Sequence, residues 1–132
     1  MIRAVLVDTG PLYAANDEDD EHHERALREL QKLARDRREI VVPYPVLNEC
    51  YSLILFRLGS RAALAWLAEM AEASFVNPGM EDYRGALTRV RALTDQKITI
   101  TDATVAALAS RLELEVWTYD HHFDVMRVRV WR

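Results

Sequence analysis

Residues 2–11 read IRAVLVDTGP. Apart from Arg3, the run Ile2–Val7 is apolar and rich in β-branched side chains, which is typical of a buried β-strand. Asp8 follows the run directly, and the Gly10–Pro11 pair predicts that the strand ends there. The chain therefore opens with a buried strand that carries a carboxylate at its carboxyl end.

The rest of the chain alternates between short apolar strands and helices. Further strands are predicted at residues 39–42, 74–76 and 116–118, and residues 128–131 are a candidate for a fifth. Helices are predicted at residues 20–38, 45–58, 60–72, 81–93 and 102–112, with Ser60 and Thr101 as N-caps of the third and the fifth. This alternation indicates an α/β domain with a parallel sheet of four or five strands flanked by helices. In such sheets, ligands bind beyond the carboxyl ends of the strands.

Length and composition predict one globular domain over residues 1–132. Half of the residues are hydrophobic and 29% are charged, which is ordinary for a globular protein. Cys50 is the only cysteine, so an intramolecular disulfide is impossible. No apolar run reaches the roughly 18–20 residues that span a bilayer, and the N-terminus lacks the pattern of a signal peptide. These features predict a cytoplasmic protein without a membrane anchor.

The net charge of −4 is unusual for a protein that binds nucleic acid, since such surfaces are usually basic. Much of the acid lies in one run, DEDDE at residues 17–21, which is most simply a solvated loop. An acidic metal site also lowers the net charge, while the ion that it holds attracts phosphate locally. The charge therefore does not exclude a protein that binds nucleic acid.

Three aspartates lie where the predicted sheet would bind a ligand. Asp8 follows the first strand, and Asp120 follows the fourth with only Tyr119 between. Both therefore lie at the carboxyl edge, where the carboxylates of neighbouring strands converge. Asp102 shares a helical face with the small apolar residues that we expect to pack on the sheet, so its side chain is predicted to point toward the sheet edge.

Glu49 is the only charged residue between Val46 and Phe56. Because this helix is apolar almost all round, we expect Glu49 to be buried, and a buried charge needs a partner or a metal ion. The nearest basic residue, Arg57, lies two turns away and toward another face.

Together these carboxylates predict a cation site. Two carboxylates about 4 Å apart repel each other by roughly 4 kcal/mol at an effective dielectric constant near 20, so such a cluster must share protons or bind a cation. Ligands that are all oxygen suit Mg²⁺ or Mn²⁺. Taken singly, each acid also has a structural interpretation: Asp8 as a turn residue, Asp102 as a helix cap, Asp120 as a loop residue and Glu49 as a buried residue without function.

Four segments resemble the motifs of PIN-domain nucleases, and especially of the VapC-type toxins of toxin–antitoxin pairs. They are VLVDTGPLYA at residues 5–14, VLNECYSL at 46–53, ITITDATVAALA at 98–109 and VWTYDHHF at 116–123. The resemblance covers almost the whole chain, and the four motifs occur in the family's order and spacing. It implies a PIN-like fold and metal-dependent hydrolysis of RNA by a water molecule in line with the leaving oxygen.

The resemblance also implies roles for individual residues. Asp8, Asp102 and Asp120 are the expected metal ligands, direct or through water, and Glu49 is expected to be a ligand or to orient the water. Thr9 and Thr118 are expected to support the metal shell. Many family members carry a further acid at the position of His122, which leaves the number of metal ions, one or two, open; contact of His122 with substrate is also open.

The resemblance further implies protein partners. The apolar helices between residues 45 and 72 hold more hydrophobic surface than one sheet face needs, so we expect part of it to form a homodimer interface. A second apolar groove is expected to accept a cognate antitoxin, with an arginine of that partner reaching the acids.

Two other functions remain open at this point. One is a non-catalytic PIN-like scaffold that binds RNA or protein. The other is an aspartyl-phosphate phosphatase with Asp8 as nucleophile; that chemistry typically has a second aspartate two positions on, where this chain has Gly10. The residues alone also do not separate RNA from single-stranded DNA.

Overall fold

The computed structural model describes residues 3–132, and the predicted strand residue Ile2 lies outside this range. Within it, a parallel four-stranded sheet has the order β3-β2-β1-β4. The strands are β1 (Arg3–Val7), β2 (Arg38–Pro43), β3 (Ser74–Val76) and β4 (Glu115–Trp117). The helices are α1 (Thr9–Ala14), α2 (His23–Arg35), α3 (Tyr44–Leu58), α4 (Ser60–Met70), α5 (Met80–Ala92), α6 (Ile100–Leu112) and α7 (His122–Val125). The predicted α/β class with a parallel sheet is confirmed.

Strand β1 lies in the centre of the sheet. Leu6 pairs with Val41 of β2 on one side and with Val116 of β4 on the other. Val5, Leu6 and Val7 are fully buried, as expected for a strand covered on both faces. Because all four strands run in the same direction, the residues that follow β1 and β4 meet at one edge.

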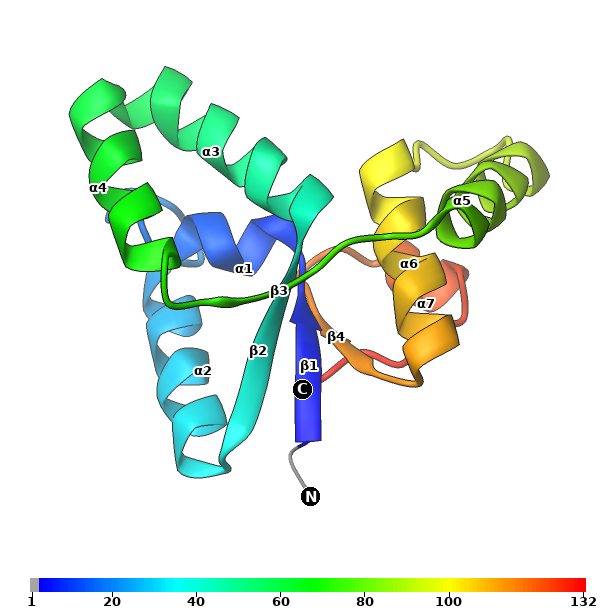
Figure 1. Cartoon of the computed structure of the whole chain (residues 1–132), viewed down its shortest axis with the longest axis horizontal. Coiled ribbons are helices and arrows are strands. Elements are labelled where there is room, and N and C mark those ends of the chain that lie inside the picture. Colours follow the sequence, from blue (N-terminus) through cyan, green and yellow to red (C-terminus); the bar gives the residue numbers. More distant parts are fainter. Residues whose placement is uncertain (1–2) are drawn as a thin grey trace.

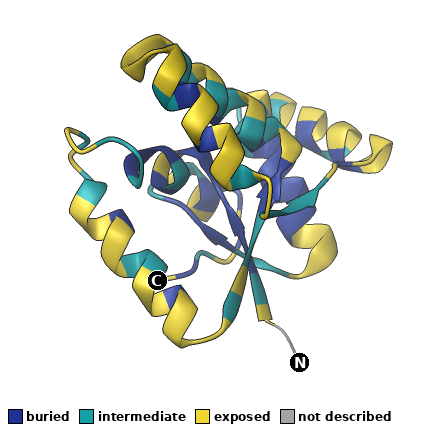
Figure 2. Ribbon diagram, turned by 60° about the vertical axis from the view of Figure 1, so that its left-hand side comes forward, coloured by how far each residue is buried: buried dark blue, intermediate teal, exposed yellow. Residues whose placement is uncertain are grey.

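The helices form two groups around the sheet (Figure 1). Helices α1 to α4 lie on one side in that view, and α5 to α7 lie on the other. Figure 2 shows that the strands are mostly buried, whereas the helices expose their outward faces. Among the residues described, no helix is long and apolar enough to cross a membrane.

Two hydrophobic clusters hold these layers together. The larger one is built on the sheet and α6, whose residues 103–109 are all buried. The smaller one joins α1, α3 and α4 through Tyr13, Cys50 and Trp66. Leu12, Leu47 and Met70 pack against both clusters, which makes the two cores continuous.

Helix α1 is an element that the sequence prediction missed. The Gly10–Pro11 pair does follow the end of β1, but a helix of six residues begins at Thr9 rather than a loop. Pro11 is tolerated there because the N–H groups of a helix's first turn have no partner within the helix.

Both predicted N-caps were wrong. Helix α6 starts two residues earlier than expected, and its cap is Thr99, whose side chain accepts a hydrogen bond from the backbone N–H of Asp102. At the start of α4, Ser60 is already helical and Gly59 is the cap, without a side-chain bond. Gly59 has φ +97°, a left-handed angle that glycine adopts without a steric penalty and that turns the chain sharply from α3 into α4.

The candidate fifth strand, residues 128–131, is a single bridge between Val130 and Val116 rather than a strand within the described chain. The segment still packs on the core, since Val128 and Trp131 are buried. Too few backbone pairs form here to extend the sheet.

Candidate active site

The four predicted acids line one open cleft at the carboxyl edge of the sheet. Asp8 follows β1, and Asp120 lies three residues beyond β4. Asp102 lies in the first turn of α6, and Glu49 lies on α3. The cleft has a volume of about 470 Å³, and its other lining residues are Thr9, Gly10, Leu53, Tyr119 and His121.

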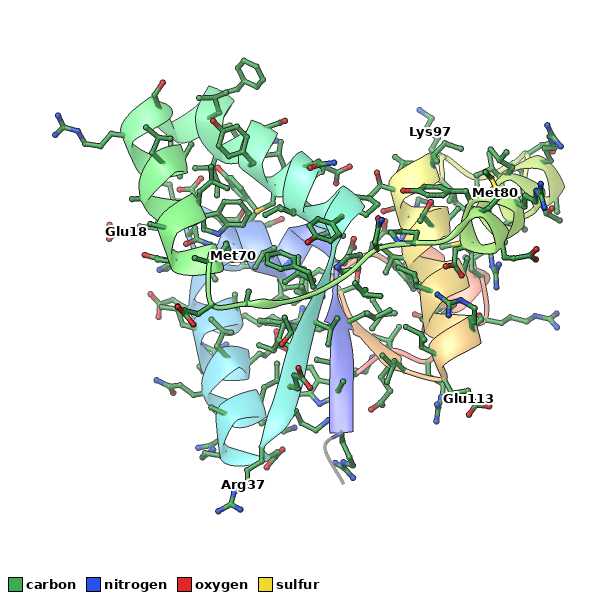
Figure 3. All side chains as sticks on the ribbon, in the orientation of Figure 1. Glu18, Arg37, Met70, Met80, Lys97 and Glu113 are labelled. Carbon is green, nitrogen blue, oxygen red and sulfur yellow. The ribbon has the colours of Figure 1, made fainter. Side chains whose placement is uncertain are left out.

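The direction of α6 explains how Asp102 reaches this edge. In Figure 3, Lys97 marks the end at which α6 begins and Glu113 the end at which it stops. Glu113 lies near the level at which β1 starts, so the first turn of α6 lies beside the carboxyl ends of the strands. Asp102 is held there by a reciprocal cap: its N–H donates to Thr99 Oγ1 at 3.0 Å, and its Oδ2 accepts from Thr99 N at 3.4 Å.

Asp8 is the most deeply buried of the four cleft acids, with 5% of its surface exposed. Its Oδ2 accepts a hydrogen bond from Thr118 Oγ1 at 2.8 Å. Its Oδ1 is buried and has no hydrogen-bond partner within the described residues, and the same is true of the neighbouring Thr9 hydroxyl. Burial, together with the charge of Asp102, raises the pKa of Asp8 to about 7, although the Thr118 bond opposes the shift.

The pKa of Asp102 is also raised. Burial is the largest cause, and the charges of Asp120 and Glu49 add to it, while the bond with Thr99 acts in the opposite direction. Asp102 therefore feels the field of two other cleft acids, and Asp8 feels the field of Asp102. The cleft concentrates negative charge that no basic side chain on its lining fully offsets.

Asp120 is fixed by its neighbours along the chain. Its backbone N–H donates to Thr118 Oγ1 at 3.0 Å, and its Oδ1 accepts from the His122 N–H at 2.9 Å. His122 Nδ1 lies 3.0 Å from the same oxygen without making a hydrogen bond, and His121 Nδ1 lies 3.8 Å from it. Asp120, His121 and His122 could each offer one ligand atom, and these atoms lie within 4.8 Å of one another.

The expected burial of Glu49 was wrong. The residue is half-buried and lines both the acidic cleft and an adjoining groove with Pro45, Leu53 and Phe56. The buried face of α3 consists of Val46, Cys50 and Ile54, so Glu49 lies on the shoulder of the helix. Phe56 is 84% exposed, which explains why an apolar sequence did not imply burial all round.

Glu29 and Tyr119, which sequence reasoning missed, support the Asp120 side of the cleft. Glu29 of α2 accepts from Tyr119 OH at 2.6 Å and from Trp117 Nε1 at 3.1 Å. Burial and the Glu29 carboxylate both raise the pKa of Tyr119, so its hydroxyl stays protonated and remains a donor. The signal in the sequence was the alternation of two aromatic residues with Thr118 and Asp120, but nothing in it pointed to Glu29.

This donor set fits a hard divalent cation. The cleft offers carboxylate oxygens, one of which is buried and unpartnered, and a buried threonine hydroxyl beside it. Carboxylates that repel one another, and that have no lysine or arginine partner within the described residues, are stabilised when a cation binds among them. The same atoms are poor ligands for soft metals, which prefer sulfur.

The fold and the cleft define an α/β domain that presents clustered carboxylates at the carboxyl edge of a parallel sheet. The chain belongs to the PIN domain family, whose model matches residues 5–128. No curated protein matches the chain in sequence.

Solved structures of similar fold come from several bacteria. VapC20 of Mycobacterium tuberculosis, described as a toxin that cleaves the sarcin–ricin loop, superposes with a TM-score of 0.83 at 21% identity, over 97% of this chain and 98% of that one. VapBC2 of Rickettsia felis, bound to promoter DNA, superposes with a TM-score of 0.75 at 14% identity, over 98% of this chain and 97% of that one. DNA-bound VapBC of Salmonella typhimurium superposes with a TM-score of 0.72 at 17% identity, over 99% of this chain and 98% of that one.

Proposed function

We propose that this PIN domain is a metal-dependent endoribonuclease that hydrolyses RNA phosphodiester bonds and is the toxin of a type II toxin–antitoxin pair. The observation that carries the proposal is the buried, unpartnered Oδ1 of Asp8 in a cleft with three further acids. The likeness to VapC20, which is described as a toxin that cleaves the sarcin–ricin loop, supports RNA as the substrate.

In this proposal Asp8, Asp102 and Asp120 hold Mg²⁺ or Mn²⁺. Such an ion supplies positive charge to a phosphodiester and makes a bound water more acidic. Glu49 orients the attacking water or completes the ligand set, because it lines the cleft and has no ion-pair partner within the described residues. Thr118 fixes the Asp8 carboxylate, and the Thr9 hydroxyl has its own bonding capacity free.

His122 replaces a possible fifth acid. Its backbone N–H holds one oxygen of Asp120, so it supports the site without adding negative charge there. Four rather than five carboxylates favour one firmly held ion, with a second, if present, held mainly by the substrate.

We also propose protein partners, a homodimer and a cognate antitoxin. Helices α3 and α4 expose Phe56, Leu58, Leu64 and Leu67, an apolar surface suited to a second copy. The groove beside Glu49 suits an antitoxin segment whose arginine reaches the acids. Light scattering at micromolar concentration tests the dimer, and a monomeric mass would contradict it.

The domain limits and the location of the protein belong to the same proposal. We infer one nuclease domain over residues 1–132, supported by the family match to residues 5–128 and by the continuous core. A cytoplasmic location is consistent with the single cysteine, Cys50, which is buried and free.

RNA cleavage with a controlled metal supply tests the function. A pool of structured and single-stranded RNA is incubated with wild type, with an Asp8→Asn/Asp120→Asn variant and with Asp124→Asn, which changes an exposed acid outside the cleft. We expect cleavage by wild type and Asp124→Asn in Mn²⁺ or Mg²⁺, and none by the double variant or in EDTA.

The scaffold alternative gives a different result. A folded wild type that binds RNA but cuts nothing in either metal, and that binds no Mn²⁺ by calorimetry, would contradict the nuclease proposal. A parallel digest of single-stranded DNA decides whether the substrate is RNA, as proposed.

A further inference from the structure

The segment that carries Thr118 and Asp120 leaves the sheet without backbone support. The last backbone bond between β1 and this segment is from Asp8 N to Trp117 O, at 2.9 Å. Within the described chain, no backbone hydrogen bond is made by Thr118 or Tyr119. Side chains must therefore hold this segment in place.

Glu29 is the group that holds it from outside the cleft. The carboxylate, whose side chain is 17% exposed, accepts from Trp117 Nε1 at 3.1 Å and from Tyr119 OH at 2.6 Å through the same oxygen, Oε1. Two residues that alternate along the chain thus share one acceptor on α2.

The alternation has a consequence for the residues in between. Strand β4 ends at Trp117 and the chain bends at Tyr119, yet the polar contacts of these residues still alternate between two sides. Trp117 and Tyr119 reach toward α2, while the Thr118 hydroxyl reaches Asp8 and the Asp120 carboxylate lines the cleft. Holding Trp117 and Tyr119 against α2 therefore fixes the directions in which Thr118 and Asp120 point.

Further contacts hold the Tyr119 ring between two helices. The Arg25 guanidinium lies 4.2 Å from the ring centroid and its Nε lies 3.5 Å from Glu29, so it offsets the Glu29 charge as well. His22 packs against the ring with centroids 4.8 Å apart. On the side of α1, a Cβ at Gly10 would be 3.8 Å from Tyr119 Cδ2.

We propose that Glu29 is a positioning residue of this active site, acting through Trp117 and Tyr119 to hold Thr118 and Asp120 in the geometry that binds the metal ion. The statement about the metal rests on the proposed function. Glu29 itself lies on α2, outside the lining of the cleft.

The test compares wild type with Glu29→Leu, Glu29→Gln and Glu24→Leu. Glu29→Leu removes the acceptor, Glu29→Gln keeps one carbonyl oxygen, and Glu24→Leu changes an exposed glutamate of the same helix. The first readout is hydrogen exchange of the Asp120 amide in the metal-free protein, since this N–H is bonded to Thr118 Oγ1. The second readout is the Kd for Mn²⁺ by calorimetry.

We expect Glu29→Leu to speed exchange at Asp120 by about ten-fold and to weaken Mn²⁺ binding by about ten-fold, the lower end of the cost of losing an outer-shell partner. Glu29→Gln should stay within about three-fold of wild type, because an amide oxygen still accepts one hydrogen bond. Glu24→Leu should match wild type. In RNA cleavage, Glu29→Leu should lower kcat with KM unchanged, because Glu29 lies outside the cleft that receives the substrate.

A folded Glu29→Leu protein with wild-type exchange at Asp120 and wild-type Mn²⁺ affinity would overturn the inference. If Glu29→Leu does not fold, Tyr119→Phe decides, because it removes only the hydroxyl donor; about three-fold faster exchange at Asp120 supports the inference, and no change contradicts it. A wild type that cuts no RNA would defeat the proposed function alone, because the exchange measurement still decides the role of Glu29.

Discussion

The Thr118 hydroxyl donates a hydrogen bond to Asp8 Oδ2 at 2.8 Å, across two neighbouring parallel strands. The hydroxyl oxygen of Thr118 in turn accepts a hydrogen bond from the backbone N–H of Asp120 at 3.0 Å. One small side chain therefore sets the spacing between two of the four cleft acids. It also satisfies one oxygen of Asp8 and leaves the other, buried Oδ1 for a ligand.

Replacing Thr118 by valine, which has nearly the same shape, tests this link. We expect Thr118→Val to lower Mn²⁺ affinity and RNA cleavage by roughly 10–100-fold, because the carboxylate of Asp8 loses its orienting donor. Thr118→Ser keeps the hydroxyl and should stay within about three-fold of wild type. Calorimetry and initial cleavage rates measure both; equal behaviour of the valine and serine variants would contradict the link.

The raised pKa of Asp8 predicts how the metal-free protein responds to pH. The folded-state pKa of about 7 lies above the ordinary value of 3.8, so the folded protein binds the proton more tightly than the unfolded chain. The resulting stability is fully present below pH 3.8 and is lost as pH rises to about 7, by up to about 4 kcal/mol for this group. The raised pKa of Asp102 acts in the same direction.

Thermal unfolding in EDTA between pH 5 and pH 8 measures this effect. We expect the Tm of wild type to fall over the range, and that of Asp8→Asn to fall less, because asparagine does not ionise. At pH 8, Asp8→Asn should therefore be the more stable protein in EDTA, although it cuts no RNA. A variant less stable than wild type at pH 8 would show that the Asp8 charge is stabilised by something other than a metal ion.

Proton release on metal binding is a separate prediction. Below pH 7 the ion must displace the proton of Asp8, so Mn²⁺ affinity should rise with pH and level off above about pH 7. Calorimetry in two buffers of different ionisation enthalpy should give about one proton released per ion at pH 6. In Asp8→Asn the release should largely disappear, and an unchanged release would assign the proton to another group.

Asp102→Asn separates the metal role of Asp102 from its capping role. The asparagine oxygen can still accept from Thr99 N, so we expect α6 to keep its cap and the Tm in EDTA to stay within a few degrees of wild type or rise. Mn²⁺ affinity should fall by at least about ten-fold. Asp124→Asn is the matched control outside the cleft, and wild-type affinity in Asp102→Asn would remove Asp102 from the ligand set.

A different aspartate is expected to serve stability alone. Asp82 of α5 is buried, accepts two bonds from Arg111 of α6, both at 2.8 Å, and caps its own helix through Gly79 N at 2.8 Å. We expect Asp82→Ala to lower the Tm by about 5–10 °C, because Arg111 and the helix end both lose their partner.

Measurements of RNA cleavage and Mn²⁺ binding distinguish this structural role of Asp82 from a role in catalysis. At a temperature where Asp82→Ala is still folded, its cleavage rate and Mn²⁺ affinity should equal those of wild type, because Asp82 does not line the cleft. Asp82→Asn should unfold at an intermediate temperature, since it keeps the cap but loses the ion pair. A loss of Mn²⁺ affinity in either variant would connect Asp82 to the site.

The sequence alone determined the architecture and the order of the four motifs. The strand patterns predicted at residues 2–7 and 116–118 are local signals, and the rule that parallel strands end at one edge then puts Asp8 and Asp120 together. The face of α6 that carries Asp102 was also predictable, because the small residues beside it, Val105, Ala106 and Ala109, can only pack against the interior.

Only the tertiary structure decided how far these acids are buried and which side chains hold them. Glu49 lies on an apolar helix, yet it is half-buried, because one face of α3 packs inward and the rest stays open. The cap of α6 falls on Thr99 rather than Thr101, and Glu29, 88 residues from Trp117, meets the strand that leads to Asp120. A local pattern predicts whether a segment is a helix or a strand, but places its ends less reliably. The partner of a side chain depends on how distant elements pack, which the sequence near that side chain does not contain.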